Sequence, residues 1–112
     1  MNARYAILSF LLAAGCTSPP GIAPGPLSPA ALGAASARWP ETSPDALEHG
    51  RQLLVDKCNQ CHGYPDLEKV DQARWPAIMD NMGKQARLSD AERELVLRFV
   101  LAERAGATSG SP

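Results

Sequence analysis

Two cysteines and a histidine near the middle of the chain have types and a spacing suited to binding a cofactor. Cys58, Cys61 and His62 form the pattern C-x-x-C-H, which is typical of c-type haem attachment. The two thiols add across two vinyl groups at one edge of a porphyrin and form thioethers. In a helix, offsets of three and four residues keep both sulfurs and the imidazole on one side, so that the imidazole reaches the iron. The motif predicts one covalently bound haem c, with His62 as an iron ligand.

Other roles of a C-x-x-C pair explain this chain less well. A structural zinc site needs four ligands, and the sequence has neither a second C-x-x-C nor an H-x3–5-H pair. A thioredoxin-like dithiol is expected in a βαβ setting, which the sequence does not predict. A disulfide between Cys58 and Cys61 suits an oxidising compartment, but it gives His62 no role.

The start of the chain reads as an export signal. Arg4 precedes an apolar run that is too short to span a bilayer, and small residues follow it. Residues 1–15 are therefore predicted to be a secretory signal peptide. The segment that ends at Cys16 resembles a bacterial lipobox, in which the cysteine is acylated, although Ala13 stands where leucine is usual. The alternative is an ordinary signal cleavage that leaves Cys16 as a free or disulfide-linked thiol.

Acylation of Cys16 would anchor the protein to a bilayer without a membrane-spanning segment. Thr17 follows the cysteine where an Asp would be a retention signal. By resemblance to enteric lipoproteins, this favours the outer membrane. The sequence thus predicts a protein of the bacterial cell envelope, lipid-anchored and facing the periplasm.

The charge of the whole chain and the proline content of its N-terminal part are two further features of the sequence. The chain has 11 Lys and Arg against 12 Asp and Glu, a balance that gives no indication of nucleic-acid binding. Residues 16–42 hold most of the prolines, which favours an extended, semi-rigid tether after the lipidated residue. Within this tether, residues 27–37 are rich enough in alanine to form a short helix. Trp39 is the one large apolar residue here that could dock on a folded domain.

Two helices are expected in the first part of the folded domain. Ser43 followed by Pro44 is a favourable helix start, and apolar residues then recur at helical spacing, which predicts a helix over 44–57. A shorter helix is expected around 76–83, with Pro76 in its first turn and Gly83 at its end; alternatively, Asp71 starts this helix earlier. No segment alternates convincingly, so the predicted fold class is all-α.

The last helix has the clearest signals. Ser89 and Glu92 match a capping box, and an apolar face follows, which predicts a helix over 90–103. Gly106 is expected to end this helix. Residues 106–112 are then a polar, disordered tail.

Beyond the haem motif, residues 43–105 resemble class I-type monohaem cytochromes c. The resemblance implies a small helical bundle around one covalent haem, here preceded by a Pro/Ala-rich linker. It also implies that the first and last helices of the domain cross closely, with a small residue facing an aromatic one; Gly50 and Phe99 are the candidates. The positions that carry the resemblance, besides the motif itself, are Gly50, Leu54, Gly63, Trp75, Met82, Leu88, Ser89, Glu92, Leu95, Phe99 and Leu101.

The resemblance also implies a methionine as the sixth iron ligand. Met82 is favoured because it stands at the predicted helix end, whereas Met79 falls on nearly the same helix face and remains an alternative. His49 is the only other histidine, and a polar helix residue is its simpler reading. Trp75 is expected either to hydrogen-bond a haem propionate or to pack in the core.

These features together predict an electron carrier rather than an enzyme. With His62 and Met82 both bound to iron, the haem would pass single electrons between a donor and an acceptor redox protein. The alternative is a haem-based gas sensor or a small haem enzyme with an open or labile sixth position. A lipoprotein without haem, acting as an assembly module, is a third reading.

Overall fold

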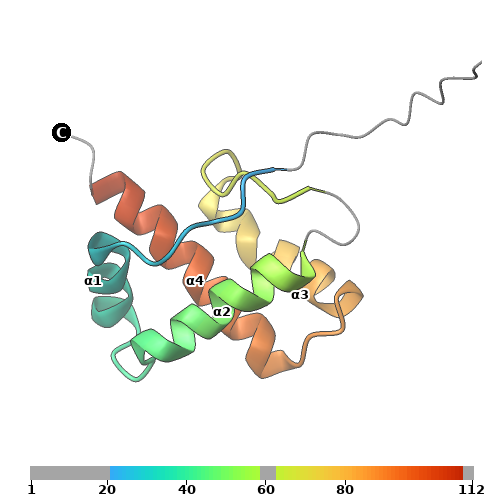
Figure 1. The fold of residues 1–112 in the computed structure, drawn as a ribbon, viewed down its shortest axis with the longest axis horizontal. Helices are drawn as coiled ribbons and strands as arrows, with labels where there is room; N and C mark the ends of the chain where they lie inside the picture. Colours follow the sequence, from blue (N-terminus) through green and yellow to red (C-terminus); the bar gives the residue numbers. More distant parts are fainter. Residues whose placement is uncertain (1–20, 59–62, 110–112) are drawn as a thin grey trace, which may run out of the picture.

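The computed structural model describes residues 21–58 and 63–109, which fold into a compact, all-helical globule without strands. The described residues form four α-helices and one short 3-10 helix, and Figure 1 shows how the α-helices are arranged. The α-helix α4 is the central element, because it packs against each of the other three α-helices. The all-α class predicted from the sequence is thus confirmed for the described residues. The elements are α1 (Pro29–Arg38), α2 (Pro44–Lys57), η1 (Gln72–Arg74), α3 (Trp75–Gln85) and α4 (Asp90–Ser109).

Helix α2 begins as its cap predicts. The Ser43 hydroxyl accepts a hydrogen bond of 3.1 Å from the backbone N–H of Ala46, and Pro44 occupies the first helical position. The observed bounds agree with the predicted helix over 44–57. Leu47 and Leu54 are buried along the face that points to α4.

Helix α4 also begins as predicted, but it ends later. The Glu92 carboxylate accepts a 2.8 Å hydrogen bond from the Ser89 N–H, and the Ser89 hydroxyl accepts one of 3.1 Å from the Glu92 N–H. The helix then continues past the predicted end at 103 to Ser109. Gly106 lies inside the helix and is buried. A Cβ at this position would lie only 2.7 Å from the backbone nitrogen of Ala31. This glycine permits α1 to approach α4 and does not end the helix.

Helix α3 likewise runs beyond the predicted range of 76–83. Gly83 is a buried residue within the helix, at a point where a Cβ would overlap the side chain of Arg93. The helix is closed instead by Arg87, which has a positive φ of 60°. The N–H of Leu88 bonds back to the carbonyl of Gly83 at 2.9 Å, the geometry of a Schellman ending.

The segment expected to be a tether is partly folded onto the domain. Residues 29–38 form α1, close to the alanine-rich stretch marked in the sequence, and Ser28 caps this helix. Ala31 and Ala35 are fully buried against Leu47 and Ala102. Their small side chains, one helical turn apart, let α1 lie close to α4. The tether expectation therefore does not describe residues 29–42, because the prolines flank this helix rather than interrupt it.

Trp39 docks on the domain at the end of α1, in agreement with the expectation from the sequence. It is half-buried and packs against both core clusters. The guanidinium groups of Arg38 and Arg98 lie 4.6 Å and 5.4 Å from the centre of its ring. The indole thereby ties the segment before α2 to α4.

The crossing of α2 and α4 depends on Gly50. A Cβ at this position would lie 2.7 Å from the carbonyl carbon of Leu95 and 3.2 Å from the backbone nitrogen of Val96. The nearest atoms to Gly50 thus belong to the backbone of α4, whereas the resemblance had suggested an aromatic partner. Phe99, one turn further along, is fully buried in the main core cluster.

We predict that Gly50→Ala destabilises the protein and that Gly33→Ala does not. The added methyl group at Gly50 must push two helix backbones apart, which costs about 1–3 kcal/mol. A Cβ at Gly33 in α1 would meet nothing within 4 Å, so alanine there gains helix propensity worth up to about 1 kcal/mol. Urea unfolding midpoints measure both effects. Equal shifts in the two variants would show that the α2–α4 crossing is not tight at Gly50.

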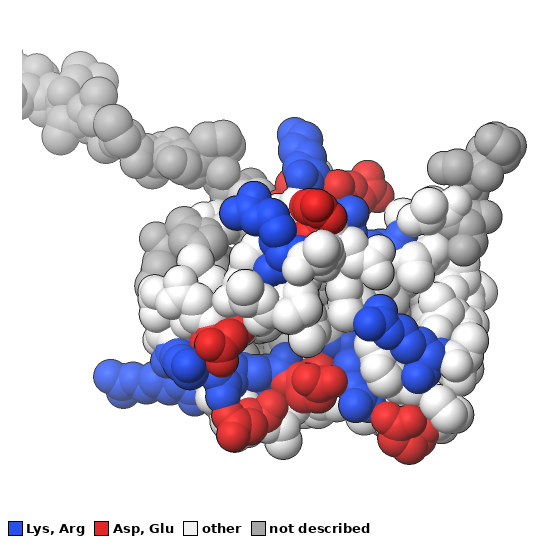
Figure 2. Space-filling model, turned by 180° about the vertical axis from the view of Figure 1, so that it is seen from behind, with Lys and Arg blue, Asp and Glu red and all other residues white. Residues whose placement is uncertain are grey.

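The surface carries charges of both signs side by side. Figure 2 shows Lys and Arg interspersed with Asp and Glu on one face. Two of the lysines form local ion pairs: Lys69 with Asp66 at 3.6 Å and Lys84 with Asp80 at 3.1 Å. Among the described residues, no helix has the length and apolar character needed to cross a membrane.

Candidate functional site

The first cysteine of the haem motif sits where α2 ends. Cys58 is the C-cap residue, and its N–H donates to the carbonyl of Leu54 at 3.0 Å. Its side chain is half-buried and packs against the main core cluster. Burial raises the pKa of the Cys58 thiol. Helix α2 therefore delivers the first sulfur to the edge of the core, whereas Cys61 and His62 lie outside the described residues, as does Cys16.

The chain that follows the motif is held in place at two points. The Tyr64 hydroxyl donates a 2.7 Å hydrogen bond to the carbonyl of Val55, in the last turn of α2. This bond holds the start of the segment after the motif against the last turn of α2. The guanidinium of Arg104 donates to the carbonyl of Leu67. No local sequence pattern predicts either contact, since both depend on how the helices pack.

The two methionines of α3 have different environments. Met79 is only 5% exposed and belongs to the main core cluster, whereas Met82 is 37% exposed. Among the described residues, Met82 and Ile22 are the two large apolar side chains that remain exposed. Met79 is therefore a core residue, whereas the thioether of Met82 is accessible to a ligand.

Trp75 is a core residue with an unsatisfied donor. It is 1% exposed, at the start of α3, and no described residue accepts a hydrogen bond from its indole N–H. A buried donor without a partner costs about 1–3 kcal/mol, so an acceptor from outside the described chain is expected here. The sequence offered core packing and a propionate contact as alternatives for Trp75, and its burial is compatible with both.

The other candidate ligands contribute little. His49 is exposed on α2, in keeping with its interpretation as a polar helix residue. Within residues 21–58 and 63–109, no group of three or more His, Cys, Asp or Glu side chains could hold a metal ion.

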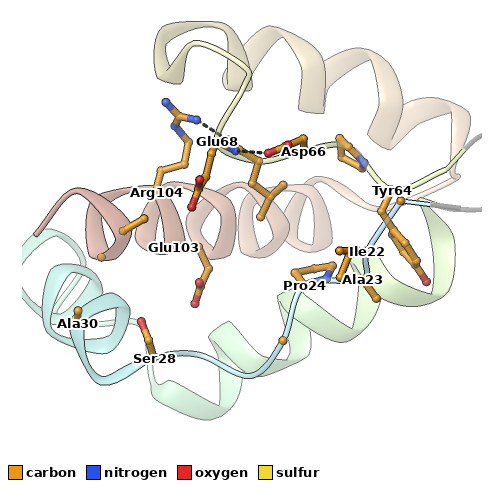
Figure 3. Close-up of a pocket in the computed structure, with 16 residues that line it drawn as sticks. Ile22, Ala23, Pro24, Ser28, Ala30, Tyr64, Asp66, Glu68, Glu103 and Arg104 are labelled. Carbon is orange, nitrogen blue, oxygen red and sulfur yellow. Dashed lines mark hydrogen bonds between the residues drawn. The ribbon is translucent and has the colours of Figure 1, made fainter. Parts of the chain in front are cut away.

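A cavity of about 740 Å³, lined in part by Tyr64, lies beside the C-terminal turns of α4 (Figure 3). Residues 21–28, the loop after Tyr64 and the last turns of α4 enclose it. Glu103 points into the space beside Ser28, whose backbone N–H donates to its carboxylate, while the Oε1 atom has no partner among the described residues. Burial is the main cause that raises the pKa of Glu103, and the Ser28 hydrogen bond opposes it. No sequence pattern predicts this cavity, because its lining residues come from three separate parts of the chain.

Glu103 should make the protein less stable as the pH rises. Its folded pKa is raised, so the folded state binds more protons than the unfolded state between the ordinary carboxyl value of 4.5 and the raised one. The free energy of unfolding therefore falls as the pH increases through that window. Glu103→Gln keeps an acceptor for Ser28 and should flatten this part of the profile. Thermal melts of both proteins from about pH 4 to pH 8 test this; parallel profiles would contradict it.

Comparisons of the chain with protein-family models, with curated proteins and with solved structures gave no match.

Proposed function

We propose that this chain is a periplasm-facing c-type cytochrome that transfers single electrons between redox partners. The observation that carries the proposal is the C-x-x-C-H motif, Cys58 to His62, which directly follows α2. In this proposal the protein is an electron carrier and has no substrate of its own.

Three features of the described residues support this proposal. Cys58 presents its thiol at the edge of the core, and the exposed thioether of Met82 is free to approach a metal. The buried indole N–H of Trp75 has no acceptor among the described residues, and a haem propionate would supply one. These three features are independent of one another, and a bound haem would account for all of them.

Each residue then has a distinct role. Cys58 and Cys61 would hold the cofactor covalently, and His62 and Met82 would hold its iron. When bound, the haem supplies reversible one-electron chemistry between Fe(III) and Fe(II). If His62 and Met82 both held the iron, they would leave no open position on it for a substrate. Acylation of Cys16 would place the carrier at the periplasmic face of the envelope, with the outer membrane favoured.

Absorption spectroscopy of the matured protein with and without carbon monoxide tests this function. We expect a low-spin spectrum, with the weak long-wavelength band of Met–iron ligation, that carbon monoxide leaves unchanged. A high-spin spectrum that shifts with carbon monoxide would contradict the proposal. It would point instead to a gas sensor or a small haem enzyme with an open sixth position.

A further inference from the structure

The chain joins the folded domain earlier than its proline content suggests. Residues 21–28, here called the N-terminal strap, lie against the body of the protein. A Cβ on Gly21 would lie 3.0 Å from the backbone nitrogen of Tyr64, so the two backbones are in direct contact. The carbonyl of Pro24 accepts a 3.3 Å hydrogen bond from Arg51 of α2. The strap leads directly into α1, which is itself packed on α4.

The strap begins beside the haem motif. Tyr64 contacts Gly21, stands two residues after His62 and is hydrogen-bonded to the end of α2. Figure 1 shows the start of the strap next to the segment that follows the motif. The chain therefore enters the domain on the side that carries the proposed redox site.

The docked strap leaves little length between the proposed lipid anchor and the domain. Five residue steps separate Cys16 from Gly21, which is a span of at most about 18 Å. A tether that continued to Ser43 would have allowed a reach of about 90 Å. The docking of the strap and α1 thus removes most of the reach that the sequence had suggested.

We propose that the lipidated N-terminus holds the haem side of this domain against the membrane, so that its partner is a redox protein exchanging electrons at the bilayer surface. This inference rests on the proposed haem and on acylation of Cys16. The composition of the strap supports it: residues 21–28 contain no charged residue, and Ile22 is 94% exposed. A large aliphatic side chain next to an acyl anchor gains from burial at a lipid interface.

The test measures how far the haem lies from the lipid headgroups. Lipidated holoprotein is bound to phosphatidylcholine vesicles that contain a dansyl-labelled headgroup lipid, whose fluorescence the haem quenches by energy transfer. One variant carries a flexible Gly/Ser segment of about twenty residues between Pro20 and Gly21, which adds a mean span of roughly 25 Å. A matched control carries the same segment after Pro112. We expect the wild type and the control to quench equally, and the insertion variant to quench at least about two-fold less.

A pair of point variants tests the strap itself. Gly21→Val must displace the strap from Tyr64, whereas a Cβ at Gly25 would meet nothing within 4 Å. Quenching should therefore fall in Gly21→Val and remain unchanged in Gly25→Val.

The possible failures are distinguishable. Haem absorbance and flotation with vesicles are recorded first on every sample. Loss of either in the wild type overturns the inference together with its premise, namely the haem or the acylation. Equal quenching by a wild type and an insertion variant that both carry haem and both float overturns the inference alone.

Discussion

Replacing Cys58 and Cys61 together with alanine is expected to abolish covalent haem incorporation. The two thiols are the only groups of the proposed site that can form bonds to the porphyrin edge, so no haem should survive denaturation in the double variant. The measurement is in-gel haem staining after expression with c-type maturation proteins. The expected effect is complete loss of the stain, with the polypeptide still detected by mass.

Cys16→Ala is the matched control for this experiment. Under the proposal, Cys16 serves the lipid anchor and not the haem, so this variant should stain as strongly as the wild type but separate from membranes. Covalent haem in the double variant would place the attachment elsewhere and remove the basis of the proposed function. Loss of stain in the Cys16 variant would mean that export, and not the motif, limits haem incorporation.

Met82→Ala and Met79→Ala are expected to have opposite consequences. Met82 is exposed and contributes little to the core, so its loss should remove the Met–iron band and lower the reduction potential. Met79 is buried with Phe99 and Leu54, so its replacement should cost about 2–5 kcal/mol of stability and leave the band intact. For each variant, the absorption spectrum reports the Met–iron band, potentiometric titration gives the reduction potential, and urea unfolding gives the free energy of unfolding.

A reversed outcome would assign the iron to Met79. In that case Met82→Ala would keep the band, and Met79→Ala would lose it together with stability. Retention of the band in both variants would exclude methionine ligation by α3 altogether.

Local signals located the starts of the helices well. Caps at Ser43 and Ser89 act through hydrogen bonds within three residues, and the structure contains these bonds. The ends were less predictable. Gly83 and Gly106 look like helix terminators in sequence, yet each lies inside a helix where another element approaches closely. A local pattern cannot distinguish a glycine that ends a helix from one that makes room for a neighbour.

The folding of the N-terminal segment was also hard to anticipate. Proline density indicates a tether, and the alanine-rich stretch gave only a weak helical signal. The packing of Ala31 and Ala35 against Leu47 and Ala102 stabilises α1, and these contacts join residues far apart in the chain. That docking changes a functional expectation, since it brings the domain close to the proposed anchor.

Some features of the candidate site could likewise be predicted from the sequence, and others could not. The haem motif is a contiguous pattern and could be identified directly, whereas the difference in burial between Met79 and Met82 depends on how α3 lies on the core. The unpaired indole of Trp75 and the bond from Tyr64 to α2 are likewise products of packing. The residues assigned to the proposed haem site therefore come from separate parts of the chain.

The most direct test of the central claim is the mass of one peptide. Trypsin should cut after Lys57 and Lys69 and release the segment from Cys58 to Lys69, which contains the whole motif. In protein matured in a host with c-type maturation proteins, we expect this peptide to carry the mass of one haem and no free thiol. The same peptide with two free thiols, or with a disulfide between Cys58 and Cys61, would contradict the assignment of this chain as a c-type cytochrome.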